Sequence, residues 1–135
     1  MHQNELTIET RGRDTLDITD RIAREVTASG VDTGLCHVFL LHTSASLLIN
    51  ENADPDVQRD LETFFSDLVP DGDSRFRHRA EGADDMAAHV RLALTHTDLT
   101  IPVRQGHLAL GTWQGIFLWE HRHKPHHRHI LVTVR

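Results

Sequence analysis

The sequence predicts a single α+β domain over residues 1–135, in which about three helices pack on a largely antiparallel β-sheet or sandwich. Three segments carry apolar residues at helical spacing. From residue 99 onward the pattern is β alone, with Gly or Pro between the candidate strands. The resulting order, β-α-β-α-α-β-β-β, is not the regular alternation that indicates a parallel sheet.

The first third of the chain contains two strand patterns around one helix pattern. LTIET (6–10) alternates as an edge strand does, and residues 18–29 repeat apolar side chains every four positions before Gly30. GLCHVFLLH (34–42) is mostly apolar and predicts a central strand. We expect the chain to cross from this strand to the next helix in a polar connection over residues 43–54.

Two further helices are predicted in the middle of the chain. Asp54 can cap a helix, and Pro55 suits its first position because no N–H is needed there. This second helix has an apolar stripe formed by Val57, Leu61, Phe64, Phe65 and Leu68. After a turn at residues 70–74, residues 83–94 predict a third helix, with Asp84 and Asp85 near its positive end. Its inward-facing residues would be Met86, Val90, Ala93 and Leu94.

The C-terminal third predicts a meander of three or four strands. LTIPV, HLALGTWQGIFLWEH and RHILVTV supply the strand patterns, and RQG and RHKPHH supply the turns. The tract HRHKPHHRH (121–129) is dense in histidine, but Pro125 places a turn at its centre. We interpret it as a solvated hairpin tip rather than a metal site.

Composition excludes several classes of protein. The net charge of −6 argues against nucleic acid as a partner, because phosphate binding needs clustered Lys and Arg. No apolar run approaches the roughly 18 residues of a membrane helix, and no secretory signal is visible. Cys36 is the single cysteine, which excludes an internal disulfide and suits a reducing cytoplasm; an inert core side chain is its favoured role. Local motifs for nucleotide binding, zinc proteases and α/β-hydrolases are absent.

The stretch LLHTSASLLINENADPDV (40–57) is the first candidate site. His42 ends the expected strand, and loops at strand ends often carry binding and catalytic residues. Asp54 has an ordinary structural role as a helix cap, whereas Asn50 and Glu51 have no such role. A binding site and a purely structural role are equally compatible with this stretch.

Two histidines and one glycine-flanked corner are further candidates. At helical spacing His89 falls on the margin of the buried face, and a lone histidine there is more often hydrogen-bonded than a ligand. His78 lies in a segment without apolar period, and only folding can bring it to His89. In GTWQG (111–115), Trp113 can form a flat wall of a pocket or simply fill the core at a bulge.

Glu120 ends an apolar strand pattern and would be costly to bury without a partner. We therefore expect an Arg, a His or a ligand beside its carboxylate. Its neighbour His121 would point to the opposite face of the strand.

Three long motifs make the chain resemble a known family. HTSASLLINENADPDV, HRAEGADDMAAHV and LTIPVRQGHLALGTWQGIFLWEH, in this order and spacing, resemble the YjbQ family, known as the secondary thiamine-phosphate synthase family. The resemblance implies a small α+β domain that assembles as a homotrimer with candidate sites in polar clefts. It also implies weak synthase activity, which couples a pyrimidine pyrophosphate to a thiazole phosphate with loss of pyrophosphate. Phe76 stands where the family commonly has tyrosine, so this chain lacks a hydroxyl there.

The resemblance assigns polar site residues to this chain by position. The residues that would contact a small phosphorylated metabolite are Thr43, Ser44, Thr112, Trp113, Gln114 and Glu120. The residues that would take part in the chemistry are His42, Asn50, Glu51, Asp54 and His89. The remaining family residues are His78, Asp84 and Asp85.

Three hypotheses follow for the function. In a transferase, Glu51 and Asp54 would hold Mg²⁺ beside the leaving pyrophosphate, His42 or His89 would donate a proton or bind phosphate, and Trp113 would stack on the pyrimidine. In a metal- or phosphate-binding module without a dedicated synthase role, His78 and His89, with another histidine or a carboxylate, would hold a Zn²⁺-like ion. In a purely structural or regulatory subunit, no small metabolite would bind.

Overall fold

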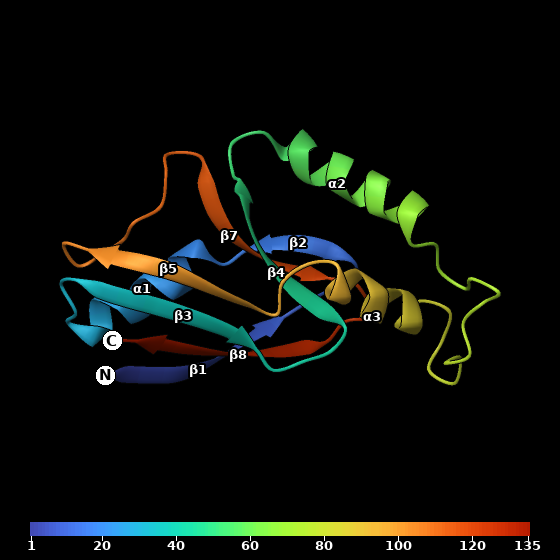
Figure 1. Cartoon of the computed structure of the whole chain (residues 1–135), viewed down its shortest axis with the longest axis horizontal. Coiled ribbons are helices and arrows are strands. Elements are labelled where there is room, and N and C mark those ends of the chain that lie inside the picture. Colours follow the sequence, from blue (N-terminus) through green and yellow to red (C-terminus); the bar gives the residue numbers. More distant parts are fainter.

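Eight strands and three helices make up the computed structural model, which describes all of residues 1–135 (Figure 1). The elements in chain order are β1 (His2–Glu9), β2 (Asp14–Asp17), α1 (Thr19–Ser29), β3 (Gly34–Leu40), β4 (Ala45–Glu51), α2 (Pro55–Leu68), α3 (Asp85–Ala93), β5 (Asp98–Arg104), β6 (His107–Leu108), β7 (Gln114–Glu120) and β8 (His127–Val134). The predicted α+β class with about three helices is confirmed.

The strands form two antiparallel sheets. The larger sheet has the order β1-β8-β3-β5-β6 and the smaller one the order β2-β7-β4. The edge position of β1 and the central position of β3 agree with the sequence-based prediction. Residues from both sheets and from α1 form one apolar core, in which Ile22 and Val26 of the helix are buried with Cys36 of β3. Burial raises the pKa of the Cys36 thiol to about 11, so the thiol is unreactive at neutral pH.

The expected polar connection over residues 43–54 is mostly a strand, which corrects the prediction. β4 pairs with β7 along its whole length, with Leu47 opposite Leu118. Alternation explains this, because Ala45 and Leu47 face the core while Ser46 turns to the other side. Hydroxyl and amide side chains between the apolar positions conceal this alternation in the sequence.

The predicted C-terminal meander is also corrected. β5 and β6 pair as a hairpin, but β7 lies in the smaller sheet and β8 lies in the larger sheet between β1 and β3. Residues 121–126 are therefore a crossover from one sheet to the other rather than a hairpin tip. Both ends of the histidine-rich tract enter the interior, because His121 and Arg128 are buried.

Helix α2 begins as predicted but packs differently. Its cap is Asp54, which accepts a hydrogen bond from the Asp56 N–H at 2.9 Å. No residue of α2 is buried, and Phe64 and Leu68 are 62% and 54% exposed. Figure 1 shows the helix standing away from the two sheets. Only part of the apolar stripe packs on the sheet: Phe65 lies edge-on to Trp119 of β7 with the ring centroids 4.9 Å apart, whereas Phe64 and Leu68 face away.

Helix α3 buries a different face from the one predicted. Its buried residues are Asp85, Ala87, Ala88 and Arg91, whereas Leu94 is 56% exposed. The small alanines allow close packing on β4, and the two charged residues are buried because each has an ionic partner. None of the three helices has the length and apolar character needed to cross a bilayer.

Candidate metal centre

The start of α3 and the loop before it bring two histidines to one carboxylate. His78 Nε2 lies 2.7 Å from Asp85 Oδ2, and His89 Nε2 lies 3.3 Å from the same oxygen. Asp85 and His89 share one face of α3 because they are four residues apart. One nitrogen from each ring and one carboxylate oxygen all lie within 4.8 Å of one another. This is a set of donor atoms that fits a transition-metal ion.

The orientation of the His89 ring is fixed by the backbone. Its Nδ1 lies 2.7 Å from the carbonyl oxygen of Thr43, just before β4. A carbonyl only accepts hydrogen bonds, so Nδ1 carries the hydrogen, and in a neutral ring Nε2 carries a lone pair. That lone pair faces the Asp85 carboxylate. A metal ion placed between the two groups would be attracted by both of them.

The Asp85 carboxylate is almost fully enclosed, with 2% of the residue exposed. Burial opposes its ionisation, but the hydrogen bond from His78 and the charge of Arg122 outweigh burial and hold the pKa of Asp85 below its ordinary value. Asp85 is therefore an anion at neutral pH, which is the form that ligates metals. The side chains of His78 and His89 are 45% and 30% exposed, so the cluster is open to solvent on one side.

Sequence reasoning missed two contributors to this cluster. One is the Thr43 carbonyl, which no sequence pattern reveals. The other is Arg122, whose NH1 group donates to Asp85 Oδ1 at 2.7 Å. The sequence did contain a signal for Arg122. This residue follows the strand pattern that ends at Glu120 and His121, and it is a cation that can pair with the acidic start of the third predicted helix at Asp84 and Asp85.

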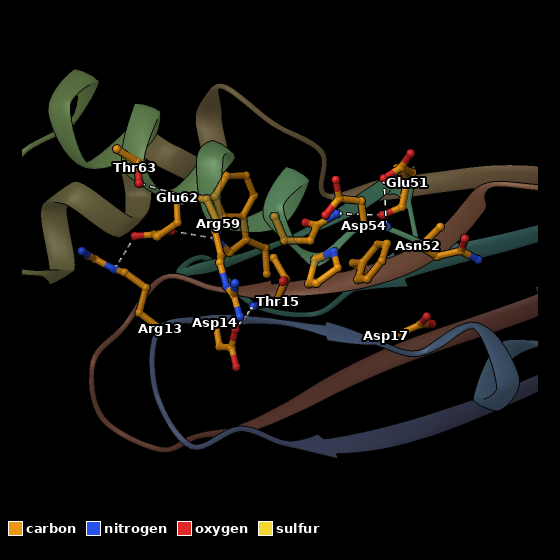
Figure 2. A pocket seen from close by; sticks show the side chains of 15 residues that line it. Arg13, Asp14, Thr15, Asp17, Glu51, Asn52, Asp54, Arg59, Glu62 and Thr63 are labelled. Carbon is orange, nitrogen blue, oxygen red and sulfur yellow. Dashed lines mark hydrogen bonds and ion pairs between the residues drawn. The ribbon is translucent and has the colours of Figure 1, made fainter.

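A second feature is a cleft of about 790 Å³ between α2 and the smaller sheet. Figure 2 shows Glu51, Asn52 and Asp54 at one end of it and Arg13 and Glu62 toward the other. The aromatic side chains that line it are Phe117 and Trp119 of β7. The Trp119 indole donates to Glu62 at 3.1 Å. The NH1 group of the buried Arg91 guanidinium donates to both Glu62 carboxylate oxygens at 3.0 Å.

The predicted site residues fall into two groups at opposite ends of β4. Thr43 lies next to the cluster of His78, Asp85 and His89, whereas Glu51 pairs with Gln114 at the far end of β4. There, the Asn52 N–H donates to the Trp113 carbonyl at 2.9 Å. Seven strand residues span about 20 Å, so the two groups do not share one hollow within a chain.

Several predicted residues have local partners. Asn50 accepts a hydrogen bond from the Glu51 N–H at 2.7 Å. Trp113 is 62% exposed and does not fill the core, and Thr112 and Gln114 are exposed beside it. Gln114 accepts a hydrogen bond from the Gly111 N–H at 2.7 Å.

Glu120 has the cationic partner that its sequence context required. Its carboxylate is fully buried and is paired with Arg128, and Thr10 donates to it at 2.6 Å. Ser44 completes this network by accepting from Arg128 at 3.0 Å. Although His121 is the next residue, it is buried as well, with Ser46 at 2.8 Å from its Nε2. These contacts give Glu120 and Ser44 a role in the interior of the fold.

His42 directly precedes Thr43 in the chain and lies near Arg128 and Glu120. Its ring stacks on His129 with the centroids 5.4 Å apart, and its Nε2 is buried without a partner. Burial, together with the positive charge of Arg128, holds the pKa of His42 below its ordinary value. His42 is thus a neutral base next to Thr43, whose carbonyl orients His89.

Comparison with known proteins gives a consistent result over the whole chain. The sequence profile of the family described as "UPF0047 protein YjbQ-like" matches residues 4–135. A UPF0047 protein of Synechocystis sp. is 56% identical over 133 residues, which cover 98% of this chain and 90% of the relative. The UPF0047 protein YjbQ of Salmonella typhimurium is 45% identical over 135 residues, which cover 99% of this chain and 97% of the relative.

Solved structures agree with these sequence matches. A YjbQ/UPF0047 family protein from Clostridium acetobutylicum superposes with a TM-score of 0.90 at 36% identity, covering 98% of this chain and 99% of that one. A hypothetical protein from Aeropyrum pernix superposes with a TM-score of 0.91 at 29% identity, covering 100% of this chain and 98% of that one.

Proposed function

The chain belongs to the UPF0047 (YjbQ-like) family, and we propose that it binds a divalent transition-metal ion through His78, Asp85 and His89. The single observation that carries the proposal is the meeting of two imidazole Nε2 atoms at one oxygen of Asp85. The second nitrogen of His89 is held by the Thr43 carbonyl, as is usual for metal-ligating histidines.

The donor set favours certain ions. Imidazole suits Zn²⁺, Cu²⁺, Fe²⁺ and Ni²⁺, whereas Mg²⁺ and Ca²⁺ prefer oxygen ligands alone. Three protein ligands with a solvent-facing side are typical of sites that bind a substrate or water, whereas structural zinc sites have four. A bound ion would polarise such a ligand and lower the pKa of a bound water.

Metal analysis of untagged protein tests this proposal. We expect one equivalent of Zn²⁺ or Co²⁺ per chain after dialysis, and its loss in His78→Ala and His89→Ala. His37→Ala is the matched control, because His37 also pairs with one aspartate, Asp98 at 2.8 Å, but has no second histidine at that carboxylate. Retention of metal by both cluster variants, or a wild-type protein that binds none, would overturn the proposal.

A second candidate function is a transferase of the thiamine-phosphate synthase type, which acts on phosphorylated metabolites in the cleft of Figure 2. The reaction forms a C–N bond between the pyrimidine methylene and the thiazole nitrogen, breaks the C–O bond to pyrophosphate and releases pyrophosphate. Arg13, Arg59 and the Trp119 indole line this cleft together with Glu51 and Asp54. This combination of charged groups and an aromatic face favours the proposal.

A coupling assay separates this candidate from the first. Glu51→Gln should lower turnover by about tenfold or more without lowering the melting temperature. Asp60→Asn is the control, because Asp60 is an exposed carboxylate on α2 outside the cleft. Wild-type turnover in Glu51→Gln and in His89→Ala would remove both the cleft and the metal cluster from the reaction.

We further propose that the protein is a homotrimer that works in the cytoplasm. The apolar side chains of α2 favour an interface, since exposed Phe64 and Leu68 would gain about 25 cal/mol for each Å² buried. Phe64→Glu should therefore give monomers by light scattering, and Asp67→Ala should not. A wild-type protein that runs as a monomer would contradict the assembly.

A further inference from the structure

Arg122 connects the metal cluster to the crossover between the two sheets. We propose that Arg122 is a positioning residue for the cluster, because its guanidinium holds Asp85 Oδ1 and so presents Oδ2 to His78 and His89. This inference rests on the proposed metal site and adds a residue to it. Arg122 makes no hydrogen bond to either histidine, and its guanidinium is not a metal ligand.

Nε, NH1 and NH2 of the Arg122 guanidinium each donate a hydrogen bond to a different acceptor. NH1 donates to Asp85 Oδ1 at 2.7 Å, Nε donates to Asp84 Oδ2 at 3.0 Å, and NH2 donates to the Glu81 carbonyl at 2.7 Å. The Arg122 side chain is only 12% exposed. Three donors in one plane give a fixed orientation that a lysine ammonium cannot reproduce.

The start of α3 explains why Arg122 is needed to orient the Asp85 carboxylate. Asp84 is the N-cap residue but makes no side-chain cap bond, so the first N–H groups of the helix receive no carboxylate from it. An aspartate at a helix start normally turns toward those N–H groups. Here Arg122 donates a hydrogen bond to one carboxylate oxygen of Asp84 and to one of Asp85. Asp85 Oδ2 remains directed at the histidines.

The competing explanation is that Arg122 only fastens the loop over residues 69–84. Asp71 provides a matched test, because it anchors the same loop without touching the cluster. It accepts from Arg13 at 3.1 and 2.8 Å and lies 2.9 Å from His123 Nε2. If loop anchoring were the whole role of Arg122, loss of the Asp71 contacts would disturb the cluster in the same way.

Titration of the full-length protein with Co²⁺ tests the inference, with d–d absorption as the readout of ligand geometry. Arg122→Gln should weaken Co²⁺ binding by about 10- to 100-fold and change the absorption spectrum. Arg122→Lys should restore little of the affinity, and Asp71→Asn should keep the wild-type affinity and spectrum. If Arg122→Gln does not fold, Asp84→Asn replaces it, with a smaller loss in the same direction.

The outcomes separate this inference from the metal site itself. Wild-type affinity and spectrum in Arg122→Gln would overturn the positioning role while the metal site stands. An equal loss in Asp71→Asn would also overturn it, in favour of loop anchoring. A wild-type protein that binds no Co²⁺ would overturn both, through the metal site.

Discussion

His78 and His89 are separated by a loop and one turn of helix, whereas five of the 12 histidines crowd into residues 121–129. His78 and His89 meet at the Asp85 carboxylate, whereas the histidine side chains of residues 121–129 do not converge on one point. Within the tract, His121 turns inward to Ser46, His123 turns to Asp71, and the others turn to separate partners on the surface. Convergence of donor atoms on one point, rather than density of histidine in the sequence, is therefore the basis of the proposed metal site.

The two regions also differ in what their residues do for the fold. The tract contains Arg128, which is buried with Glu120 in the interior, while the cluster is partly open to solvent. A buried ion pair is sensitive to loss of one partner, because the other charge is left without compensation. The cluster histidines are partly exposed to solvent and can lose a partner at lower cost.

The largest expected effect in the comparison is on stability. Arg128→Ala should lower the free energy of unfolding by roughly 3–5 kcal/mol, because it leaves the fully buried Glu120 carboxylate unpaired. His78→Ala should lower it by less than about 1 kcal/mol. Urea denaturation of both variants measures the difference, and similar values for the two would remove the distinction between the regions.

The next effect is on the pH dependence of stability. Burial, with the charges of Arg91 and Arg13, lowers the pKa of His121 from 6.5 to about 3, so the folded protein keeps this ring neutral. As the pH falls below about 6.5, the unfolded chain takes up a proton that the folded chain excludes. Stability should therefore fall toward pH 3, by at most about 1.4 kcal/mol per pH unit from this one site.

The variant His121→Gln sharpens this prediction. It should flatten the loss of stability between pH 6.5 and 4, whereas His127→Gln should leave the slope unchanged because His127 is exposed. Urea midpoints measured across this pH range give the slopes. Parallel slopes in wild type and His121→Gln would show that the ring is not kept neutral in the folded state.

The smallest effect is expected at the surface of the tract. Replacement of His126 and His127 by alanine should change the free energy of unfolding by no more than about 0.5 kcal/mol each. It should also leave the stoichiometry of tightly bound Zn²⁺ unchanged. A drop in that stoichiometry by elemental analysis would assign the metal to the tract rather than to the cluster.

Local patterns in the sequence were sufficient for much of the fold. The period of α1, the cap and proline at the start of α2, and the apolar run of β3 each depend on neighbours in the sequence. The features that were not predicted depend on residues that lie far away in the sequence. The buried face of α3 contains Asp85 and Arg91 only because Arg122 and Glu62 reach them from elsewhere in the chain.

The candidate site shows the same limit. His78 and His89 were predicted together as ligands of one ion, and the family resemblance added Asp85, but no local pattern in the sequence indicates that the three meet. The Thr43 carbonyl takes part because β4 begins beside α3, and this contact joins elements that lie far apart in the sequence. The exposure of Phe64 and Leu68 on α2 was not predicted for a related reason, since hydrophobic period predicts an apolar face but not which surface covers it.

Anomalous diffraction from a crystal soaked in Zn²⁺ is the most direct test of metal binding by His78, Asp85 and His89, because it locates the ion without reference to activity. We expect a strong peak within bonding distance, about 2.0–2.2 Å, of His78 Nε2, His89 Nε2 and an Asp85 oxygen. A strong peak at the tract over residues 121–129 together with none at Asp85 would contradict it.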